Sequence, residues 1–166
     1  MRKLLLFALI LFTATQCHVR KGVYERDGLT FVVPDGWKVS MQIKNDAIQY
    51  AMASRKGNDN LATWEVYRMN GVISVNQGIQ IVAQEMSDNF IFTDYELGRP
   101  TSSQYQNRDA VRYPFRYRIL GLPQRGFLYG YRQKGYTIIV MLDAPDEEWL
   151  EVMDDYDLLE NTLEVK

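Results

Sequence analysis

Hydrophobic and polar residues alternate with a period of two over long parts of this chain, a pattern typical of strands that bury one face. The first such stretch, residues 29–33, ends at Pro34-Asp35-Gly36, which predicts a turn. A second stretch follows Trp37 and covers residues 39–44. The two stretches predict strands separated by a turn near the start of the folded part of the chain.

Residues 48–54 and 61–69 alternate in the same way and flank the segment Lys56-Gly57-Asn58-Asp59-Asn60, whose residues favour a turn. We therefore expect these two stretches to pair as a hairpin. Later in the chain, residues 127–131 alternate in the same way and predict another strand, and the turn at Lys134-Gly135 leads into a further strand at residues 136–142.

The most regular alternation is AVRYPFRYRIL, residues 110–120. Its hydrophobic residues share one face of the predicted strand, and Arg112, Pro114, Arg116 and Arg118 share the other. Because proline has no amide hydrogen to donate to a neighbouring strand, Pro114 predicts that this strand lies at a sheet edge or contains a bulge.

Between these strands the hydrophobic period lengthens to that of an α-helix. The helical positions are Val75, Ile79, Val82, Met86 and Phe90. Ser74 precedes this run and Gln77 follows it by three residues, which predicts a capping box at the first turn of the helix. The polar segment 101–107 beyond the helix is expected to be exposed.

The C-terminal segment predicts a second helix. Pro145 suits the first turn, and the acidic residues 146–148 complement the positive end of the helix dipole. The expected buried stripe is Trp149, Val152, Met153, Tyr156, Leu159 and Leu163. Antiparallel strands with one inserted helix and one terminal helix predict an α+β fold, an antiparallel sheet flanked by helices.

The order of these elements, together with the early strand that ends in FVVPDGW (residues 31–37), resembles the PsbP-like fold. That fold is an α/β/α sandwich found in photosystem extrinsic subunits, a Ran-binding nuclear transport factor and DcrB-type bacterial lipoproteins. The resemblance spans residues 24–166 and implies a non-enzymatic binding or accessory protein. It transfers no functional residue, because Pro34 and Trp37 are explained by a turn and a core anchor.

The N-terminus has the pattern of a bacterial export signal. Arg2 and Lys3 precede the uninterrupted hydrophobic residues 4–12. Cys17 then lies where a lipoprotein signal places the thiol that receives lipid, and several acyl chains make such an anchor stable. We therefore expect a signal peptide at residues 1–16, with Cys17 as the lipid attachment site.

Other outcomes for the N-terminus remain open. Gln16 and Ala14 depart from the residues usual at those positions of a lipoprotein signal. Cleavage near Thr15 would release a soluble periplasmic or secreted protein, and an uncleaved segment would stay in the membrane. In the leading interpretation, residues 17–23 form a tether and residues 24–166 form a single globular domain exposed to the periplasm.

The composition predicts one hydrophobic core that no internal disulfide stabilises. The sequence is 46% hydrophobic and 24% charged, as in an ordinary globular domain. Cys17 is the only cysteine, so no internal disulfide can form. His18 is the only histidine and lies in the predicted tether, so the predicted domain has no imidazole. This excludes Ser-His-Asp and Cys-His catalysis and zinc sites built on histidine or cysteine.

The sequence therefore predicts no catalytic residue, no metal site and no cofactor. It contains no glycine-rich phosphate loop and no EF-hand spacing. Asp154, Asp155 and Asp157 could offer oxygen ligands to calcium, but neighbouring helical residues project in different directions, so a solvated acidic face is favoured. Carboxylates that are distant in sequence can still meet in space, which leaves a hydrolase site open as an alternative.

Charge is divided unevenly along the chain. Residues 145–166 contain nine acidic residues and one lysine, whereas residues 17–144 contain sixteen basic and twelve acidic residues. The candidate partner surface is Arg112, Arg116, Arg118 and Arg132, beside Lys134. Arginine and tyrosine are enriched at protein interfaces. A plain solvated face or contact with anionic headgroups would explain the same residues, and the predicted export argues against nucleic acid.

The sequence thus predicts a lipid-anchored, non-enzymatic accessory or binding protein of the bacterial envelope. Two alternatives make distinct structural predictions. A hydrolase would use carboxylates or tyrosines that converge in a cleft with shifted pKa values. A carrier of a small apolar ligand would show a cavity of a few hundred Å³ between sheet and helix. The aromatic stripes at 113–117 and 127–131 are expected to form core, with a shallow cleft rimmed by tyrosines as the alternative.

Overall fold

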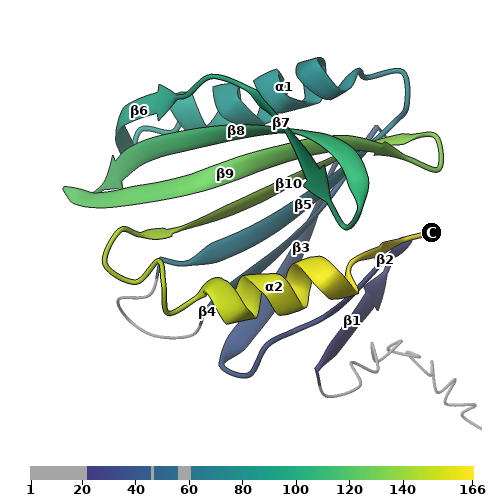
Figure 1. Ribbon diagram of the computed structural model, residues 1–166, viewed down its shortest axis with the longest axis horizontal. Coiled ribbons are helices and arrows are strands. Elements are labelled where there is room, and N and C mark those ends of the chain that lie inside the picture. The colour runs from purple at the N-terminus through teal and green to yellow at the C-terminus, as the bar shows by residue number, and fades with distance from the viewer. Residues whose placement is uncertain (1–21, 46, 56–60) are drawn as a thin grey trace, which may run out of the picture.

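The computed structural model describes residues 22–45, 47–55 and 61–166, and it contains a large sheet, a small sheet and two helices (Figure 1). The strands are β1 (Val23–Arg26), β2 (Leu29–Val32), β3 (Trp37–Asn45), β4 (Ile48–Arg55), β5 (Thr63–Met69), β6 (Phe92–Leu97), β7 (Thr101–Tyr105), β8 (Arg108–Ile119), β9 (Leu122–Gln133), β10 (Tyr136–Pro145) and β11 (Glu164–Val165). The helices are α1 (Val75–Ser87) and α2 (Met153–Thr162).

The large sheet is antiparallel, with the strand order β3-β4-β5-β10-β9-β8-β6. β4 pairs with β5 as predicted, with Ile48 opposite Met69. Strand β10 lies in the middle of the order and is buried on both faces. Its side chains alternate between two hydrophobic clusters, since Val140 belongs to one and Ile139 to the other. The sheet therefore separates two cores.

Helix α1 covers one face of this sheet and packs against β9 and β10. The capping box is confirmed, because the Ser74 hydroxyl accepts from the Gln77 amide while the Gln77 side chain accepts from the Ser74 amide. The predicted end of the helix was wrong: α1 stops at Ser87, and Phe90 is 93% exposed. The Asn89 side chain accepts from the Ile91 amide, which favours a turn over another helical residue.

Helix α2 lies on the opposite face of the sheet (Figure 1). It buries Tyr156 and Leu159 as predicted, but it begins at Met153, not at Pro145. Pro145 ends strand β10 and pairs with Gln124 of β9. Residues 146–151, between β10 and α2, form successive turns. In the first of them the Glu148 amide donates to the Pro145 carbonyl at 3.1 Å. Trp149 continues the helical spacing of the α2 hydrophobic residues, so the sequence pattern predicted a single helix that included these turns.

A three-stranded sheet, β1-β2-β11, completes the α2 side of the molecule. The sequence predicted β2, but neither β1 nor β11. Val23, assigned to the tether, is the first residue of β1. The Val32 amide of β2 donates to the Thr162 hydroxyl at 2.9 Å, which joins this sheet to the end of α2. Cys17 and His18 lie outside the described residues.

Pro114 predicted an edge strand or a bulge; β8 is an inner strand, so the edge was wrong, and the irregularity in its pairing with β6 lies between Thr93 and Glu96 of β6. Along β8 the neighbouring strand changes from β7, which pairs as far as Arg112, to β6, which pairs from Phe115. Pro114 lies at this change of partner, where its carbonyl accepts from the Gly98 amide at 2.7 Å. Pro114 has no amide hydrogen, but neither β6 nor β7 pairs with it, so no hydrogen bond of these ladders is lost. The polar segment expected to be exposed contains strand β7, which the sequence did not predict, and most of that strand is exposed, although Tyr105 is buried.

The layers are thus α1, the large sheet, and then α2 with the small sheet, which confirms the predicted α+β sandwich. Within the ranges that the structure describes, neither helix is long or apolar enough to cross a bilayer.

Candidate functional site: a cleft between α1 and the large sheet

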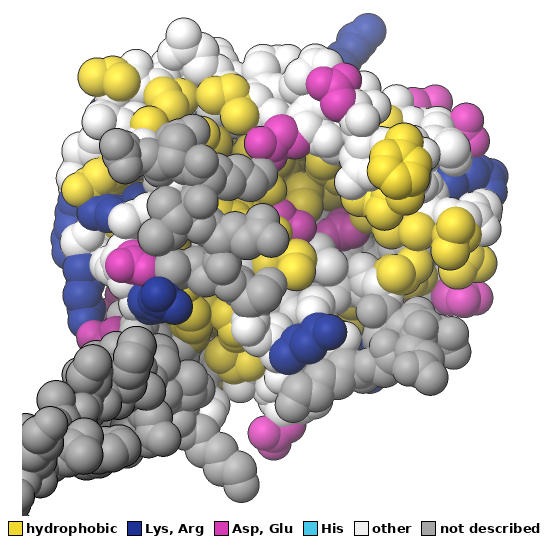
Figure 2. All heavy atoms as spheres, turned by 180° about the vertical axis from the view of Figure 1, so that it is seen from behind, with side chains coloured by type: hydrophobic (Ala, Val, Ile, Leu, Met, Phe, Trp, Pro, Cys, Tyr) yellow, Lys and Arg dark blue, Asp and Glu magenta, His cyan; other side chains and the backbone are white. Residues whose placement is uncertain are grey.

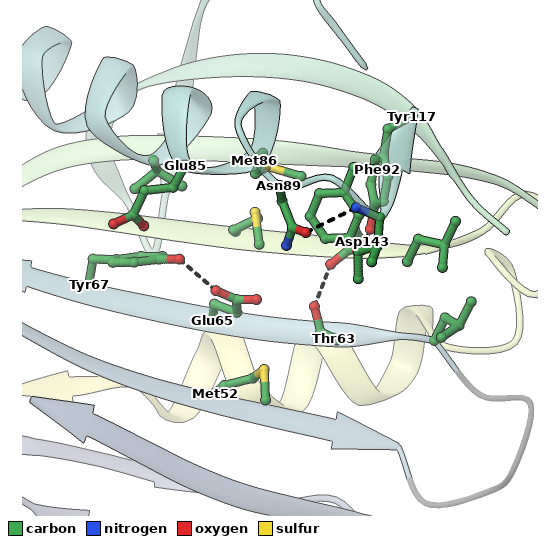
Figure 3. Close-up of a pocket in the computed structure, with 15 residues that line it drawn as sticks. Met52, Thr63, Glu65, Tyr67, Glu85, Met86, Asn89, Phe92, Tyr117 and Asp143 are labelled. Atoms are coloured by element: carbon green, nitrogen blue, oxygen red, sulfur yellow. Dashed lines mark hydrogen bonds between the residues drawn. The ribbon is translucent and has the colours of Figure 1, made fainter. Parts of the chain in front are cut away.

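A cleft with a volume of about 470 Å³ opens between the C-terminal half of α1 and the large sheet (Figure 3). Its side chains come from α1, the α1–β6 segment, strands β4, β5, β6, β8 and β10, and Leu61 before β5. On the face opposite to that of Figure 1, a hollow between hydrophobic side chains shows acidic side chains inside it (Figure 2).

The walls of the cleft are mainly hydrophobic. Val82 and Met86 face it from α1, Phe92 and Ile119 from the adjacent ends of β6 and β8, and Met141 from β10. Phe92 and Ile119 are paired residues, which places them side by side at one end of the cleft. A cavity of this size with apolar walls and a few polar groups has the properties of a small-molecule site.

Strand alternation brings polar residues to the floor of the same cleft. Thr63, Glu65 and Tyr67 occupy every second position of β5 and share the α1 side of the sheet. Asp143 of β10 is the cross-strand partner of Thr63. Tyr117 reaches Asp143 from β8, across Gly126 of the intervening strand β9.

Gly126 leaves room for the Phe115 ring beside Asp143. A Cβ atom there would lie 2.2 Å from the Leu142 carbonyl oxygen and 2.5 Å from the Phe115 ring. Any larger residue would therefore displace the β10 backbone or the Phe115 ring next to Asp143.

Asp143 is buried, with 2% of its surface exposed, and each of its carboxylate oxygens accepts a hydrogen bond from a hydroxyl group. Thr63 donates to Oδ1 and Tyr117 donates to Oδ2. Burial raises the pKa of Asp143 to about 7, the two hydroxyl hydrogen bonds lower it in part, and the charge of Glu65 raises it further. On the α2 side, the Tyr156 hydroxyl donates to the Asp143 backbone carbonyl at 2.5 Å.

Glu65 is the second acid of the floor and is also nearly buried. Its Oε2 accepts from the Tyr67 hydroxyl at 2.7 Å, as Figure 3 shows. Burial raises the pKa of Tyr67 well above its usual value, and the charge of Glu65 adds to this rise. Tyr67 therefore keeps its proton and acts as a donor. Glu85 extends from α1 toward the sheet above Tyr67 (Figure 3).

The described residues that line the cleft include three acids and no lysine, arginine or histidine. Over the described ranges, no three acidic, histidine or cysteine side chains come close enough to hold a metal ion. The floor can therefore accept hydrogen bonds and attract positive charge.

Three of the four arginines predicted as a partner surface share one face of β8, on the α2 side. Arg112 is half-buried, with its guanidinium 4.8 Å from the centre of the Phe127 ring. Arg116 is exposed and lies directly opposite Arg125 of β9. Arg118 pairs with Asp94 at 3.3 Å, so part of its charge is compensated within the molecule.

Arg132 lies on the other face of the sheet and is not part of this group. Alternation along β9 directs it to the α1 side, where its guanidinium donates to the carbonyl of Gly71 at 2.7 Å and to the hydroxyl of Thr137 at 2.8 Å. These bonds hold the segment before α1. The sequence could not separate Arg132 from the other three because the β8–β9 register sets their faces.

A cavity between sheet and helix was expected from the sequence only as a property of an apolar-ligand carrier, and the acids that line it were not identified. The available signal was an acid within a hydrophobic strand: Asp143 directly follows the run IIVML, and Glu65 lies between Trp64 and Val66. A carboxylate in such a run is expected to be buried and to need hydrogen-bond donors. Their proximity depends on the pairing of β5 with β10.

No protein-family model matches the sequence, and no curated protein matches it as a relative. The solution structure of cyanobacterial PsbP (CyanoP) from Synechocystis sp. PCC 6803 is similar, with a TM-score of 0.57 and 13% identity over 87% of this chain and 91% of that chain. LpqN of Mycobacterium tuberculosis, described as involved in cell envelope biogenesis, gives a TM-score of 0.44 and 13% identity over 83% of both chains. PA94 of Pseudomonas aeruginosa, described as a putative regulator, gives 0.45 and 10% over 87% of this chain and 96% of that chain.

Proposed function

Since this chain has the PsbP-like fold, as its sequence predicted, we propose that it is a non-enzymatic accessory protein of the bacterial envelope that acts by binding. In this proposal Cys17 anchors the chain to a membrane, and the cleft between α1 and the large sheet takes a small, largely apolar ligand. The export pattern of residues 1–16 supports the location, and the apolar walls of the cleft support the ligand.

The observation that carries the binding role is the state of Asp143. Both of its carboxylate oxygens already accept hydrogen bonds from Thr63 and Tyr117, and the side chain is 2% exposed. A general acid or base must come within hydrogen-bond reach of its substrate. Asp143 is instead used to hold β5, β8 and β10 together, and the cleft offers a shaped surface.

Ligand binding can be tested with N-phenyl-1-naphthylamine, a neutral probe whose fluorescence rises in apolar surroundings. We expect saturable binding that Ile91→Lys reduces about tenfold, because Ile91 lines the cleft and is 42% exposed, so the change should not disturb the core. Val72→Lys is the matched control, since Val72 is 85% exposed and does not line this cleft. Equal binding by both variants would contradict the proposal.

A hydrolase is the alternative that one observation favours: the pKa of Asp143 is near 7 within a cleft, as an acid–base catalyst requires. Mass spectrometry of candidate esters and glycosides incubated with the protein separates the two functions. We expect unchanged compounds. A product that forms with the wild type and is lost with Asp143→Asn would replace binding by catalysis.

The anchor at Cys17 can be tested by the intact mass of the membrane-extracted protein. We expect the mature chain to begin at Cys17 and to carry acyl groups, and Cys17→Ser to lose them. An N-terminus near residue 16 without added mass would instead support the soluble exported form.

We also propose that the exposed arginines of β8 contact a protein partner. Arg116 is the most informative position, because its exposed guanidinium makes no hydrogen bond or ion pair with any other residue that the structure describes. Arg112 is less suitable, since replacing it would also remove its packing on Phe127. We expect Arg116→Glu to reduce crosslinking to a partner isolated with the wild type, whereas Lys38→Glu, at an exposed position of the edge strand β3, should not. A partner that is retained equally by both variants would exclude this surface.

A further inference from the structure

We propose that the ligand of the cleft is a cationic amphiphile, an organic ammonium group carried on an apolar chain. The ammonium group would lie near the acidic floor, and the chain would leave over the exposed hydrophobic residues beyond Phe92 and Ile119. The inference rests on the proposed binding function and adds the chemical class of the ligand.

The first argument is the charge of the lining. Among the described lining residues, Glu65, Glu85 and Asp143 are acidic and none is basic. The donors to Asp143 are neutral hydroxyl groups, so these hydrogen bonds do not cancel its negative charge when it is ionised. The same negative charges act on two nearby tyrosines. Burial is the largest cause that raises the pKa of Tyr67 and of Tyr117, and the charge of an acid, Glu65 or Asp143, is the next largest.

The second argument is the type of surface that surrounds these acids. The rings of Tyr67, Phe92 and Tyr117 line the cleft. Aromatic faces attract ammonium groups, and the attraction is stronger where water is excluded. Met52 and Met86 also line it, and their thioether side chains adapt to apolar groups of irregular shape. Acids with aromatic rings suit an organic cation better than an anion or a sugar.

A metal ion is a poorer fit to the same acids. A hard divalent cation needs several oxygen ligands around one point. The described acids do not form such a group, and the oxygens of Asp143 are already directed to Thr63 and Tyr117. Acids at separate positions match an organic ammonium group, which needs no closed shell of oxygen ligands.

The direction of the apolar chain follows from the end of the cleft at Phe92 and Ile119. Ile91 lines the cleft, and the residue before it, Phe90, is 93% exposed. Ile119 also lines it, and the residue after it, Leu120, is 90% exposed. Because Phe92 pairs with Ile119, these two exposed side chains belong to neighbouring segments. The apolar wall therefore continues onto the surface, where exposed hydrophobic clusters mark binding sites.

Isothermal titration calorimetry with three probes of equal chain length tests the charge preference. The probes are n-decylammonium, 1-decanol and n-decyl sulfate, used below their aggregation limits at about pH 8 and low ionic strength, where screening is weak. We expect the ammonium to bind at least about tenfold more tightly than the alcohol, and the sulfate more weakly than the alcohol. Decanol binding as tight as the ammonium would overturn the inference and leave the proposed function intact. Binding of none of the probes would overturn both.

Variants assign the preference to the cleft. Glu85→Gln should weaken n-decylammonium about fivefold or more and leave decanol unchanged, and its exposed helical position makes misfolding unexpected. Glu65→Gln is the second variant and should act in the same direction. Asp157→Asn is the control, because Asp157 is an exposed acid on α2. If Glu85→Gln lowered the affinity for n-decylammonium and decanol equally, or if only Asp157→Asn lowered the affinity for n-decylammonium, the acids of the cleft would not be the cause of the charge preference.

The path of the chain has its own test. Phe90→Ser with Leu120→Ser should weaken n-decylammonium about threefold or more and leave n-butylammonium unchanged, since only the longer chain reaches the surface. Leu150→Ser is the control, because Leu150 is 83% exposed and precedes α2. An unchanged affinity for n-decylammonium, or an equal loss for both amines, would overturn this path.

Discussion

At the scale of single residues, Asp143 is the most informative position of the molecule. It is an acid within a hydrophobic strand, and it accepts hydrogen bonds from two hydroxyl groups, one on the adjacent strand β5 and one on β8, beyond β9. Burial nevertheless outweighs these donors, because its pKa is raised from 3.8 to about 7. The folded protein therefore holds the Asp143 proton more tightly than the unfolded chain does.

This difference predicts a dependence of stability on pH. The contribution of Asp143 is fully present below its unfolded pKa of 3.8 and is lost as the pH rises through about 7. The total loss is up to about 4 kcal/mol. Urea unfolding at several pH values should show a steeper decline for the wild type than for Asp143→Asn. Parallel declines would mean that Asp143 is ionised in the folded protein well below pH 7.

Gln124 gives a second prediction at this scale. It is 1% exposed, and neither its side-chain nitrogen nor its oxygen has a hydrogen-bond partner among the described residues. A buried amide without partners costs about 1–3 kcal/mol. Gln124→Met should therefore raise the free energy of unfolding by about 1 kcal/mol or more, measured in urea. Gln104→Met, at an exposed position of β7, should change it little. A destabilised Gln124→Met would show that the amide is satisfied.

At the scale of elements, local signals located the first helix better than the last one. The start of α1 was predicted because Ser74 and Gln77 interact only with each other's backbone, three residues apart. The start of α2 was not, because the turns at 146–151 have hydrophobic residues at helical spacing. Strands β7 and β11 were missed because β8 and β2 provide the pairing that makes them strands.

The capping box predicts how α1 depends on its first turn. Ser74→Ala removes a side-chain acceptor from the Gln77 amide and should cost about 1 kcal/mol of unfolding free energy. Ser87→Ala, at the exposed opposite end of the same helix, is the control and should stay within about 0.5 kcal/mol. Chemical denaturation measures both variants. Equal values would mean that the cap does not stabilise the helix in this fold.

At the scale of the whole molecule, the two ends of the described chain close the same small sheet. Strand β11 pairs with β2, and the Lys166 amide donates to the Gly28 carbonyl at 2.7 Å. Leu163 and Val165 are buried there against the α2 side of the large sheet. The α2 side is thereby packed, whereas the cleft opens on the α1 side.

Removal of residues 163–166 should therefore destabilise the entire α2 side. Two buried aliphatic side chains contribute roughly 3–6 kcal/mol together, so the thermal midpoint of the shortened chain should fall by about 6 °C or more. Lys166→Ala keeps the backbone bond to Gly28 and should have a small effect. A shortened chain with an unchanged midpoint would show that β11 is not needed to close the small sheet.

Residue periodicity was sufficient for the α+β class, the central strands, the start of α1 and the stripe of α2, because each depends on neighbours within a few positions. The resemblance to the PsbP-like fold came from the order of these elements together with one short motif. The cleft and the separation of Arg132 from the other arginines required the sheet register. Thr63 and Asp143 meet because β5 and β10 pair, and no local pattern specifies which distant strands become neighbours.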